Sequence, residues 1–273
     1  MSGSKANNQK DSEFLSTLER GLRVMRAFSR ERPEMTLSEV ATVTELSPAV
    51  ARRCLHTLES LGYIGRDGKQ FLLTPEVVSF ASAFLESMNV EQVIRPHLQT
   101  VRDQTGDSSS LAVLSKSEVL YLVHVSTNRM VRLAAGMGTR FPAYATSLGR
   151  ILLAQLPDEQ LDNYLKAQDF RRFTSKTIVD RLRLRQIMQQ ARRNDYAMIQ
   201  DELDYGIISV AVPIRSGGPD VIAAINCSTA TSRVDIEEML ESRLPYLREA
   251  AKEIEIELQR YPALVHSIRT QSG

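Results

Sequence analysis

The 273-residue sequence contains no tryptophan, only two cysteines, and no apolar run near the roughly 18 residues that cross a bilayer. Its N-terminal segment is polar, so the sequence predicts neither a membrane span nor a signal peptide, and we expect a cytoplasmic location. Cys54 and Cys227 provide no disulfide framework and no metal-ligand spacing. Both lie among apolar residues, which predicts two small core side chains.

A strong charge of either sign is also lacking. The chain has 34 Lys and Arg against 33 Asp and Glu, and residues 1–75 hold 11 against 9. Any affinity for nucleic acid must therefore come from the placement of individual cations. An assembly of two or more subunits would multiply such contacts, so we expect a homodimer or tetramer. The length predicts two domains, and 42% hydrophobic residues are typical of globular protein.

Residues 36–71 follow the order helix, tight turn, helix and hairpin. Thr36 and Glu39 have the spacing of a capping box, which opens the first helix. Ser47 and Pro48 fit the N-cap and first position of a second helix. Asp67-Gly68 is a hairpin turn signal. This order predicts a winged helix-turn-helix, a module that places its second helix in the major groove of DNA.

The faces of that second helix divide by polarity. The apolar side is Val50, Cys54, Leu58 and Leu61, and the opposite side is Ala49, Arg52, Arg53, His56 and Thr57. Arginine can bind guanine bidentately, each good contact contributing about 1–3 kcal/mol of discrimination. The alternative is that both arginines are solvated surface charges. Arg66 and Lys69 flank the hairpin turn, and we expect them to contact phosphates. Thr36, Ser47 and Pro48, at the starts of the two helices, complete the expected DNA-binding residues.

Upstream, residues 15–28 have the periodicity of a helix, with Leu18, Leu22, Val24, Met25 and Phe28 expected to face inward. Arg20, Arg23, Arg26 and Arg30 share a flank, for which we favour solvated surface over phosphate contact. We predict a disordered tail over 1–13, the winged helix-turn-helix over 14–74 and a linker helix over 75–89. An effector domain over 90–262 and a C-terminal tail over 263–273 complete the expected organisation.

The larger C-terminal part alternates strands and helices. Strands are predicted over 108–115, 118–125, 131–134, 196–200, 206–214 and 221–228. Helices are predicted over 90–104, 147–156, 158–167, 180–193 and 236–259. Short hairpin connections between several strands indicate an antiparallel sheet, and the overall class is α+β.

One segment of this part resembles a small-molecule site. Thr146 fits a helix N-cap, which leaves the amides of the first turn, beginning at Ser147 and Leu148, without helical partners. Such a helix end attracts a carboxylate or phosphate. Tyr144 lies in the loop leading to it. On the strands, Ser209, Asn226 and Ser228 interrupt apolar runs; internal hydrogen bonds or a polar ligand could satisfy them.

No catalytic or metal-binding motif is present, and no cofactor is predicted. Asp201, Glu202 and Asp204 form an acidic cluster beside Tyr205. Solvated carboxylates or inter-subunit ion pairs are favoured there over acid-base catalysis or a cation site. His124 alternates with apolar residues and is interpreted as structural. Residues 166–193 hold nine Lys and Arg against two Asp; we favour a solvated face or a subunit interface over a second nucleic-acid surface.

Several segments together resemble the IclR family of bacterial transcriptional regulators. They are LERGLRVMRAF, LESLGYIGRDGKQFLL, PAYATSLGRILLA, YAMIQDELDYGIISVAVPI and AAINCS, and the resemblance extends from about Leu15 to Leu258. It implies an N-terminal winged helix, a helical linker, a C-terminal GAF-like effector domain, and dimers that pair into tetramers. The implied function is ligand-responsive binding to operator DNA, with no enzymatic activity; the rival classes are a hydrolase and a protein-interaction module.

By position, the family pattern implies ligand contacts at the amides of Ser147 and Leu148 and at the side chains Ile207, Ser209, Asn226 and Ser228. Ile199 and Gln200 stand where some relatives have acidic residues, so the resemblance does not imply that this chain binds the same effector as those relatives. Within the family, the chain is most similar to the branch that answers to protocatechuate, 4-hydroxybenzoate or β-ketoadipate. The alternative is a repressor of an unrelated carbon-source pathway; the sign of regulation and the operator stay open.

Overall fold

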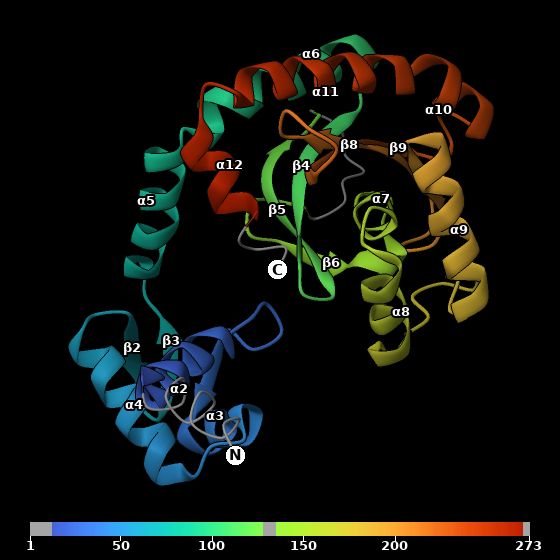
Figure 1. Ribbon diagram of the computed structural model, residues 1–273. Coiled ribbons are helices and arrows are strands. Elements are labelled where there is room, and N and C mark those ends of the chain that lie inside the picture. Colours follow the sequence, from blue (N-terminus) through green and yellow to red (C-terminus); the bar gives the residue numbers. More distant parts are fainter. Residues whose placement is uncertain (1–12, 128–134, 270–273) are drawn as a thin grey trace, which may run out of the picture. The chain divides into compact units, whose positions relative to one another are not determined.

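The computed structural model describes residues 13–127 and 135–269, which form two compact units (Figure 1). The first unit ends at Phe84 and the second begins at Leu85, so the boundary falls inside the predicted linker. The predicted tail (except its last residue) and the predicted strand over 131–134 lie outside the described residues. Within the described ranges, no helix has the length and apolar character needed to span a bilayer.

The described part of the first unit begins with helices that pack on a small sheet. Its elements are α2 (Ser16–Arg26), β1 (Glu34–Thr36), α3 (Leu37–Thr44), α4 (Pro48–Ser60), β2 (Ile64–Asp67) and β3 (Gln70–Leu73). The strands pair antiparallel in the order β1-β3-β2. The predicted helix-turn-helix and hairpin are confirmed, whereas β1 was not predicted because three residues carry too little periodicity.

Side-chain caps set the helix boundaries of this unit as the sequence predicts. The Thr36 amide donates to Glu39 Oε2 at 2.7 Å, while Thr36 Oγ1 accepts from the Glu39 amide at 3.4 Å. Glu45, at a φ of 55°, ends α3. Ser47 Oγ then accepts from the Val50 amide, which starts α4 after only three intervening residues.

The sequence-based prediction of which residues of α2 and α4 face the core is partly wrong. Leu18, Leu22 and Leu61 are exposed, although each was expected to face inward. The core instead takes Ala51 and Leu55 from α4, along with Val24, Ala27 and Phe28 from α2, Met35, Val40 and Ile64. The apolar stripes are wider than the core needs, so their outer edges line a groove between α2 and α4.

Two helices follow the first unit's hairpin. Thr74 caps a single 3-10 turn over Pro75–Val77, and α5 runs over Val78–Met88. Asn89, at a φ of 55°, separates α5 from α6 (Val90–Thr105). The predicted pair of helices is confirmed, and none of the described α5 residues is fully buried.

The second unit is built on a six-stranded antiparallel sheet that curls around α7 (Ser147–Ala154) (Figure 1). The strands are β4 (Ser108–Ser115), β5 (Glu118–Val125), β6 (Arg140–Pro142), β7 (Ala197–Gln200), β8 (Ile207–Arg215) and β9 (Val221–Ala230). Their order is β6-β5-β4-β9-β8-β7. Helix α7 packs on the concave face; α6 and α11 (Leu244–Leu258) cover the other face. The same unit contains the helices α8 (Asp158–Ala167), α9 (Arg181–Asn194) and α10 (Ile236–Ser242).

The C-terminal helices differ from the prediction. One long helix was expected over 236–259, but the structure has α10 and α11, separated at Arg243. Pro245 lies at the start of α11, where a backbone amide would have no helical partner, whereas in the interior of one long helix it would remove a hydrogen bond and favour a break. A further helix, α12 (Pro262–Arg269), buries Leu264 and Ile268 where only a tail was expected.

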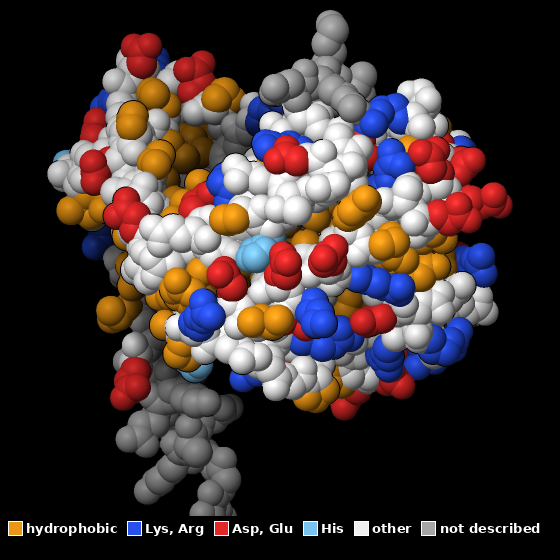
Figure 2. All heavy atoms as spheres, turned by 90° about the horizontal axis from the view of Figure 1, so that it is seen from above, with side chains coloured by type: hydrophobic (Ala, Val, Ile, Leu, Met, Phe, Trp, Pro, Cys, Tyr) orange, Lys and Arg blue, Asp and Glu red, His pale blue; other side chains and the backbone are white. Residues whose placement is uncertain are grey.

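The outer helical surface of the second unit carries mixed charge. Viewed from the side of α6 and α11, acidic, basic and apolar side chains are interspersed (Figure 2). His97 of α6 hydrogen-bonds Glu253 at 2.9 Å and Glu257 at 3.4 Å, which ties α6 to α11. The described residues of this face form no extended basic surface for nucleic acid.

Candidate effector site and candidate DNA-binding face

The N-terminus of α7 is held rigidly against the preceding turn. Thr146 Oγ1 accepts from the Gly149 amide at 3.0 Å, as predicted for the N-cap. A Cβ on Gly149 would lie 2.1 Å from the Ala143 carbonyl oxygen, so only glycine permits this close approach. Among the described residues, the amides of Ser147 and Leu148 have no hydrogen-bond partner. Two donors at a positive helix end are therefore available to an anion.

Polar side chains form two rows across the concave face of the sheet, beside this helix end. In one row Ser108 pairs in register with Ser228, which pairs with Ser209. In the other row Ser110 lies between His124 and Asn226. Because residues in register on antiparallel strands point to the same side, these six side chains make a polar floor beneath α7.

A β-bulge brings Tyr121 and His124 to the same face. Ser110 pairs with His124 and Ala112 pairs with Tyr121, with a shift in register between Leu111 and Ala112. Strict alternation would have put Tyr121 and His124 on opposite faces, but the extra residue in the bulged strand realigns them. His124 Nδ1 hydrogen-bonds Ser110 Oγ at 2.9 Å, so this histidine belongs to the floor.

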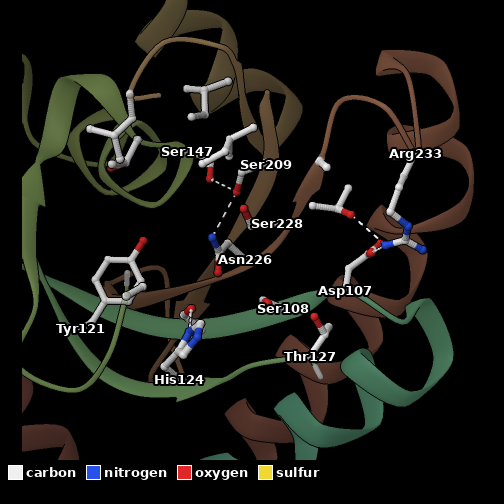
Figure 3. Close-up of a pocket in the computed structure, with 18 of the residues that line it drawn as sticks. Asp107, Ser108, Tyr121, His124, Thr127, Ser147, Ser209, Asn226, Ser228 and Arg233 are labelled. Carbon is white, nitrogen blue, oxygen red and sulfur yellow. Dashed lines mark hydrogen bonds and ion pairs between the residues drawn. The ribbon is translucent and has the colours of Figure 1, made fainter. Parts of the chain in front are cut away.

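The helix end and the polar floor enclose a cavity of about 250 Å³ (Figure 3). Ser147 Oγ and Ser209 Oγ are 2.8 Å apart, and Asn226 Nδ2 donates to Ser209 Oγ at 3.1 Å. Asn226 Oδ1 is buried and has no hydrogen-bond partner among the described residues. A buried amide oxygen without a partner is costly, which indicates a polar ligand or water at this position.

A charged cluster lies at another end of the cavity. The buried carboxylate of Asp107 is ion-paired with Arg233 and with Arg243, the latter at 3.1 Å. Arg233 also donates to Thr229 Oγ1 at 2.8 Å. Asp107, Thr229 and Arg233 all line the cavity.

The predicted effector residues divide into two groups. Ser147, Ile207, Ser209, Asn226 and Ser228 line the cavity. Tyr144 does not: it packs against Phe170, and its hydroxyl donates to the Arg171 carbonyl at 2.7 Å. The Leu148 side chain is also in the core, so this residue can offer only its amide.

Several cavity residues were not predicted from the sequence, namely Ser108, Ser110, Tyr121, His124, Asp107 and Arg233. The three serines at 108–110 could have indicated the polar floor, because hydroxyl groups in a buried strand need hydrogen-bond partners. The positions of Asp107 and Arg233 depend on contacts between segments more than 120 residues apart, for which the sequence carries no local signal.

The acidic cluster considered for catalysis has structural partners. Glu202 is buried and binds Arg150 bidentately, with Nη–Oε distances of 2.6 and 2.5 Å. Asp201 accepts from Lys176 at 2.6 Å, which holds the pKa of this carboxyl below its ordinary value. Tyr205 donates to Ser175 Oγ. The expectation of solvated carboxylates or inter-subunit ion pairs is wrong for Asp201 and Glu202, because both are paired with cations of the same chain.

The basic residues over 166–193 are largely engaged locally. Lys176, Arg185 and Arg192 form ion pairs with Asp201, Asp162 and Asp158, respectively. Arg171 lies over the Phe173 ring, and Arg172 donates to the Thr177 carbonyl. These contacts within the chain favour a structural role for the basic residues over a second nucleic-acid surface.

The polar face of α4 is open. Ala49, Arg52, Arg53, His56 and Thr57 are all exposed, and so are Ser47 and Pro48 at the helix start. No hydrogen bond or ion pair to another described residue restrains the side chains of Arg52 and Arg53. Their guanidinium groups can therefore turn toward an incoming partner.

The hairpin cations differ from each other. Arg66 Nε donates to the Gly68 carbonyl at 2.8 Å, and its guanidinium lies over the Phe71 ring. Lys69 is exposed at the hairpin tip. The Thr36 hydroxyl is occupied by the capping box, so Thr36 positions α3. On the α2 flank, Arg23 is paired with Glu19.

Comparison with known protein families identifies both units. The family model described as IclR helix-turn-helix domain matches residues 17–68, and the one described as bacterial transcriptional regulator IclR C-terminal matches residues 82–256. The chain belongs to the IclR family of bacterial transcriptional regulators. It is therefore a regulator and not an enzyme, with an N-terminal helix-turn-helix domain that binds DNA and a C-terminal effector domain.

Two curated relatives and one solved structure show which regulators of the family the chain is similar to. The chain is 36% identical to the Pca regulon regulatory protein of Pseudomonas putida over 245 residues, 89% of this chain and 84% of that protein. It is 32% identical to the p-hydroxybenzoate hydroxylase transcriptional activator of Acinetobacter baylyi, covering 89% and 91%. An IclR homologue from Microbacterium hydrocarbonoxydans, solved with 4-hydroxybenzoate, superposes with a TM-score of 0.75 at 28% identity, covering 89% and 99%. The chain is thus similar to regulators of aromatic-acid pathways.

Proposed function

We propose that the exposed face of α4 reads an operator half-site in the major groove. Arg52, Arg53 and His56 face base edges, while Ala49 allows the helix end to approach the DNA closely. Ser47 and Pro48 bring the Ala49 amide, near the start of α4, toward a phosphate. The observation that carries this assignment is the pair of unrestrained arginines on the second helix of a helix-turn-helix.

Phosphate contacts come from the hairpin in this proposal. Lys69 is the freer cation, whereas Arg66 must give up its contact with Gly68 or bind through its remaining nitrogens. Because one subunit offers few such contacts, the regulator acts in the cytoplasm as a homodimer or tetramer on paired half-sites. No membrane partner is proposed.

The effector is a small carboxylate that binds in the cavity beneath α7. Its carboxylate accepts from the amides of Ser147 and Leu148, and Asn226 together with Ser209 binds a neighbouring polar atom. The hydroxyl of Ser228 and the side chain of Ile207 contact the rest of the molecule. The names of the relatives support an aromatic acid or β-ketoadipate, and genes of aromatic-acid catabolism as targets.

Binding can change transcription only if the effector prefers one arrangement of the paired DNA-binding units over another. The test is fluorescence anisotropy with DNA from upstream of the protein's own gene, over a salt series, with and without 4-hydroxybenzoate, protocatechuate or β-ketoadipate. We expect specific binding with a steep salt dependence, and a shift in affinity with one of these acids.

Asn226→Leu, which removes the amide from the cavity, should abolish that shift and leave DNA binding intact. A protein that binds the upstream DNA no better than unrelated DNA would instead favour a protein-interaction module. Equal DNA affinity with and without every acid would contradict the effector assignment.

A further inference from the structure

Two arginines meet a buried carboxylate at the end of the cavity that lies away from α7. Asp107 is buried between Arg233 and Arg243. Glu238, exposed on α10, pairs with Arg243 at 2.9 Å and leaves Arg233 with Asp107 alone. Among the described residues no other carboxylate is paired with Arg233.

Most of the donor capacity of the Arg233 guanidinium is not taken up by described residues. Nη1 makes its contacts to Asp107, Thr229 and the Gly106 carbonyl, while Nε and Nη2 have no partner among the described residues. Burial and the neighbouring Arg243 lower the pKa of Arg233. An anion at this position would therefore find two donors on Arg233, Nε and Nη2, that no described residue occupies.

The two polar ends of the cavity are separated by the length of a small ligand. Asn226 lies next to Ser209 and Ser147, whereas Thr229, three residues along β9, contacts Arg233. Three strand residues span about 10 Å. Figure 3 shows Arg233 and Asp107 across the cavity from Ser147 and Ser209.

We propose that Arg233 is a second anion anchor, so that the effector cavity selects small dicarboxylates over monocarboxylates. This proposal rests on the effector site proposed above. One carboxylate binds the amides of Ser147 and Leu148, and the other binds Arg233 through Nε and Nη2. A phenol oxygen could also accept from Arg233, but it brings no negative charge to the Asp107–Arg233–Arg243 cluster and binds more weakly.

The test is calorimetric titration of the full-length protein with two matched pairs of probes. Adipate and hexanoate share a six-carbon chain, and terephthalate and benzoate share a ring; 4-hydroxybenzoate tests the phenol. We expect each dicarboxylate to bind at least tenfold more tightly than its partner, which corresponds to about 1.4 kcal/mol. Arg233→Gln should remove that preference, and Arg233→Lys should retain part of it.

Arg215→Gln is the matched control, because Arg215 has an ion pair with Asp195 and a side-chain exposure of 30%, against 31% for Arg233, but does not line the cavity. It should leave the preference intact. In the Arg233 variants, Asp107 retains its ion pair with Arg243. An unchanged midpoint of thermal unfolding would show that these variants are folded.

The outcomes separate the two proposals. Equal binding of the paired probes, or a preference that survives Arg233→Gln, would overturn the second anchor and leave the effector site standing. If none of the five probes binds, the effector site and the second anchor both fail. The DNA-binding assignment would still stand on its own assay.

Discussion

The buried ion pair between Arg150 and Glu202 offers a stringent test of how the effector unit is held together. Their side chains are only 2% and 7% exposed, and Arg150 also donates to the Tyr144 carbonyl at 2.8 Å. Arg150→Met would leave the Glu202 carboxylate buried with one remaining amide donor, from Ile178. Removing one partner of such a pair costs about 3–5 kcal/mol. For a domain of this size, that lowers the thermal midpoint by about 6–20 °C.

Scanning calorimetry of the full-length protein measures this change in the transition of the effector unit. Arg102→Met is the matched control, because Arg102 and Asp103 form an ion pair with side chains that are 32% and 63% exposed. That pair should contribute no more than about 1 kcal/mol. The double variant Arg150→Met, Glu202→Met should recover part of the loss, since no unpaired charge remains. An Arg150→Met midpoint no lower than that of the control would refute the reasoning.

Two other substitutions test the site and its surroundings. Gly149→Ala should force the Ala143–Ala145 turn away from α7, lowering both the thermal midpoint and the affinity for the effector; a variant with native values for both would show that the turn adapts. Asp201→Asn tests pH dependence: Lys176 lowers the pKa of Asp201, so its stabilisation is present above the unfolded-state pKa and disappears as pH falls through the folded-state pKa. The variant should thus have a lower midpoint than the wild type at pH 7 and the same midpoint in acid, and a difference that persists or grows in acid would contradict this sign.

Local signals explain what could be predicted. The capping box at Thr36, the N-caps at Ser47 and Thr146, and the alternation in β8 and β9 depend on neighbouring residues, and the structure has each of them. These features were enough to predict the helix-turn-helix, every described strand of the larger sheet except β6, and three residues of the polar floor, Ser209, Asn226 and Ser228.

The remainder depends on contacts that a local pattern does not contain. The bulge that aligns Tyr121 with His124 shifts the register of β5, so alternation alone misplaces one of the two. Periodicity identified the apolar residue Leu18 but could not show where the core ends, and this side chain is exposed. Arg233 reaches Asp107 across 126 positions, which only the folded chain brings together.

The most direct test of the central claim is the sequence specificity of Arg52→Ala. The measurement compares affinities for the operator and for the same duplex with its contacted guanines replaced, in wild type, in Arg52→Ala, and in Arg193→Ala as a charge-matched control outside the helix-turn-helix. We predict that Arg52→Ala loses about 1–3 kcal/mol of discrimination between the two duplexes and keeps its fold and effector binding, while the control behaves as wild type. Undiminished discrimination by Arg52→Ala would contradict the assignment of the α4 face as the surface that reads DNA.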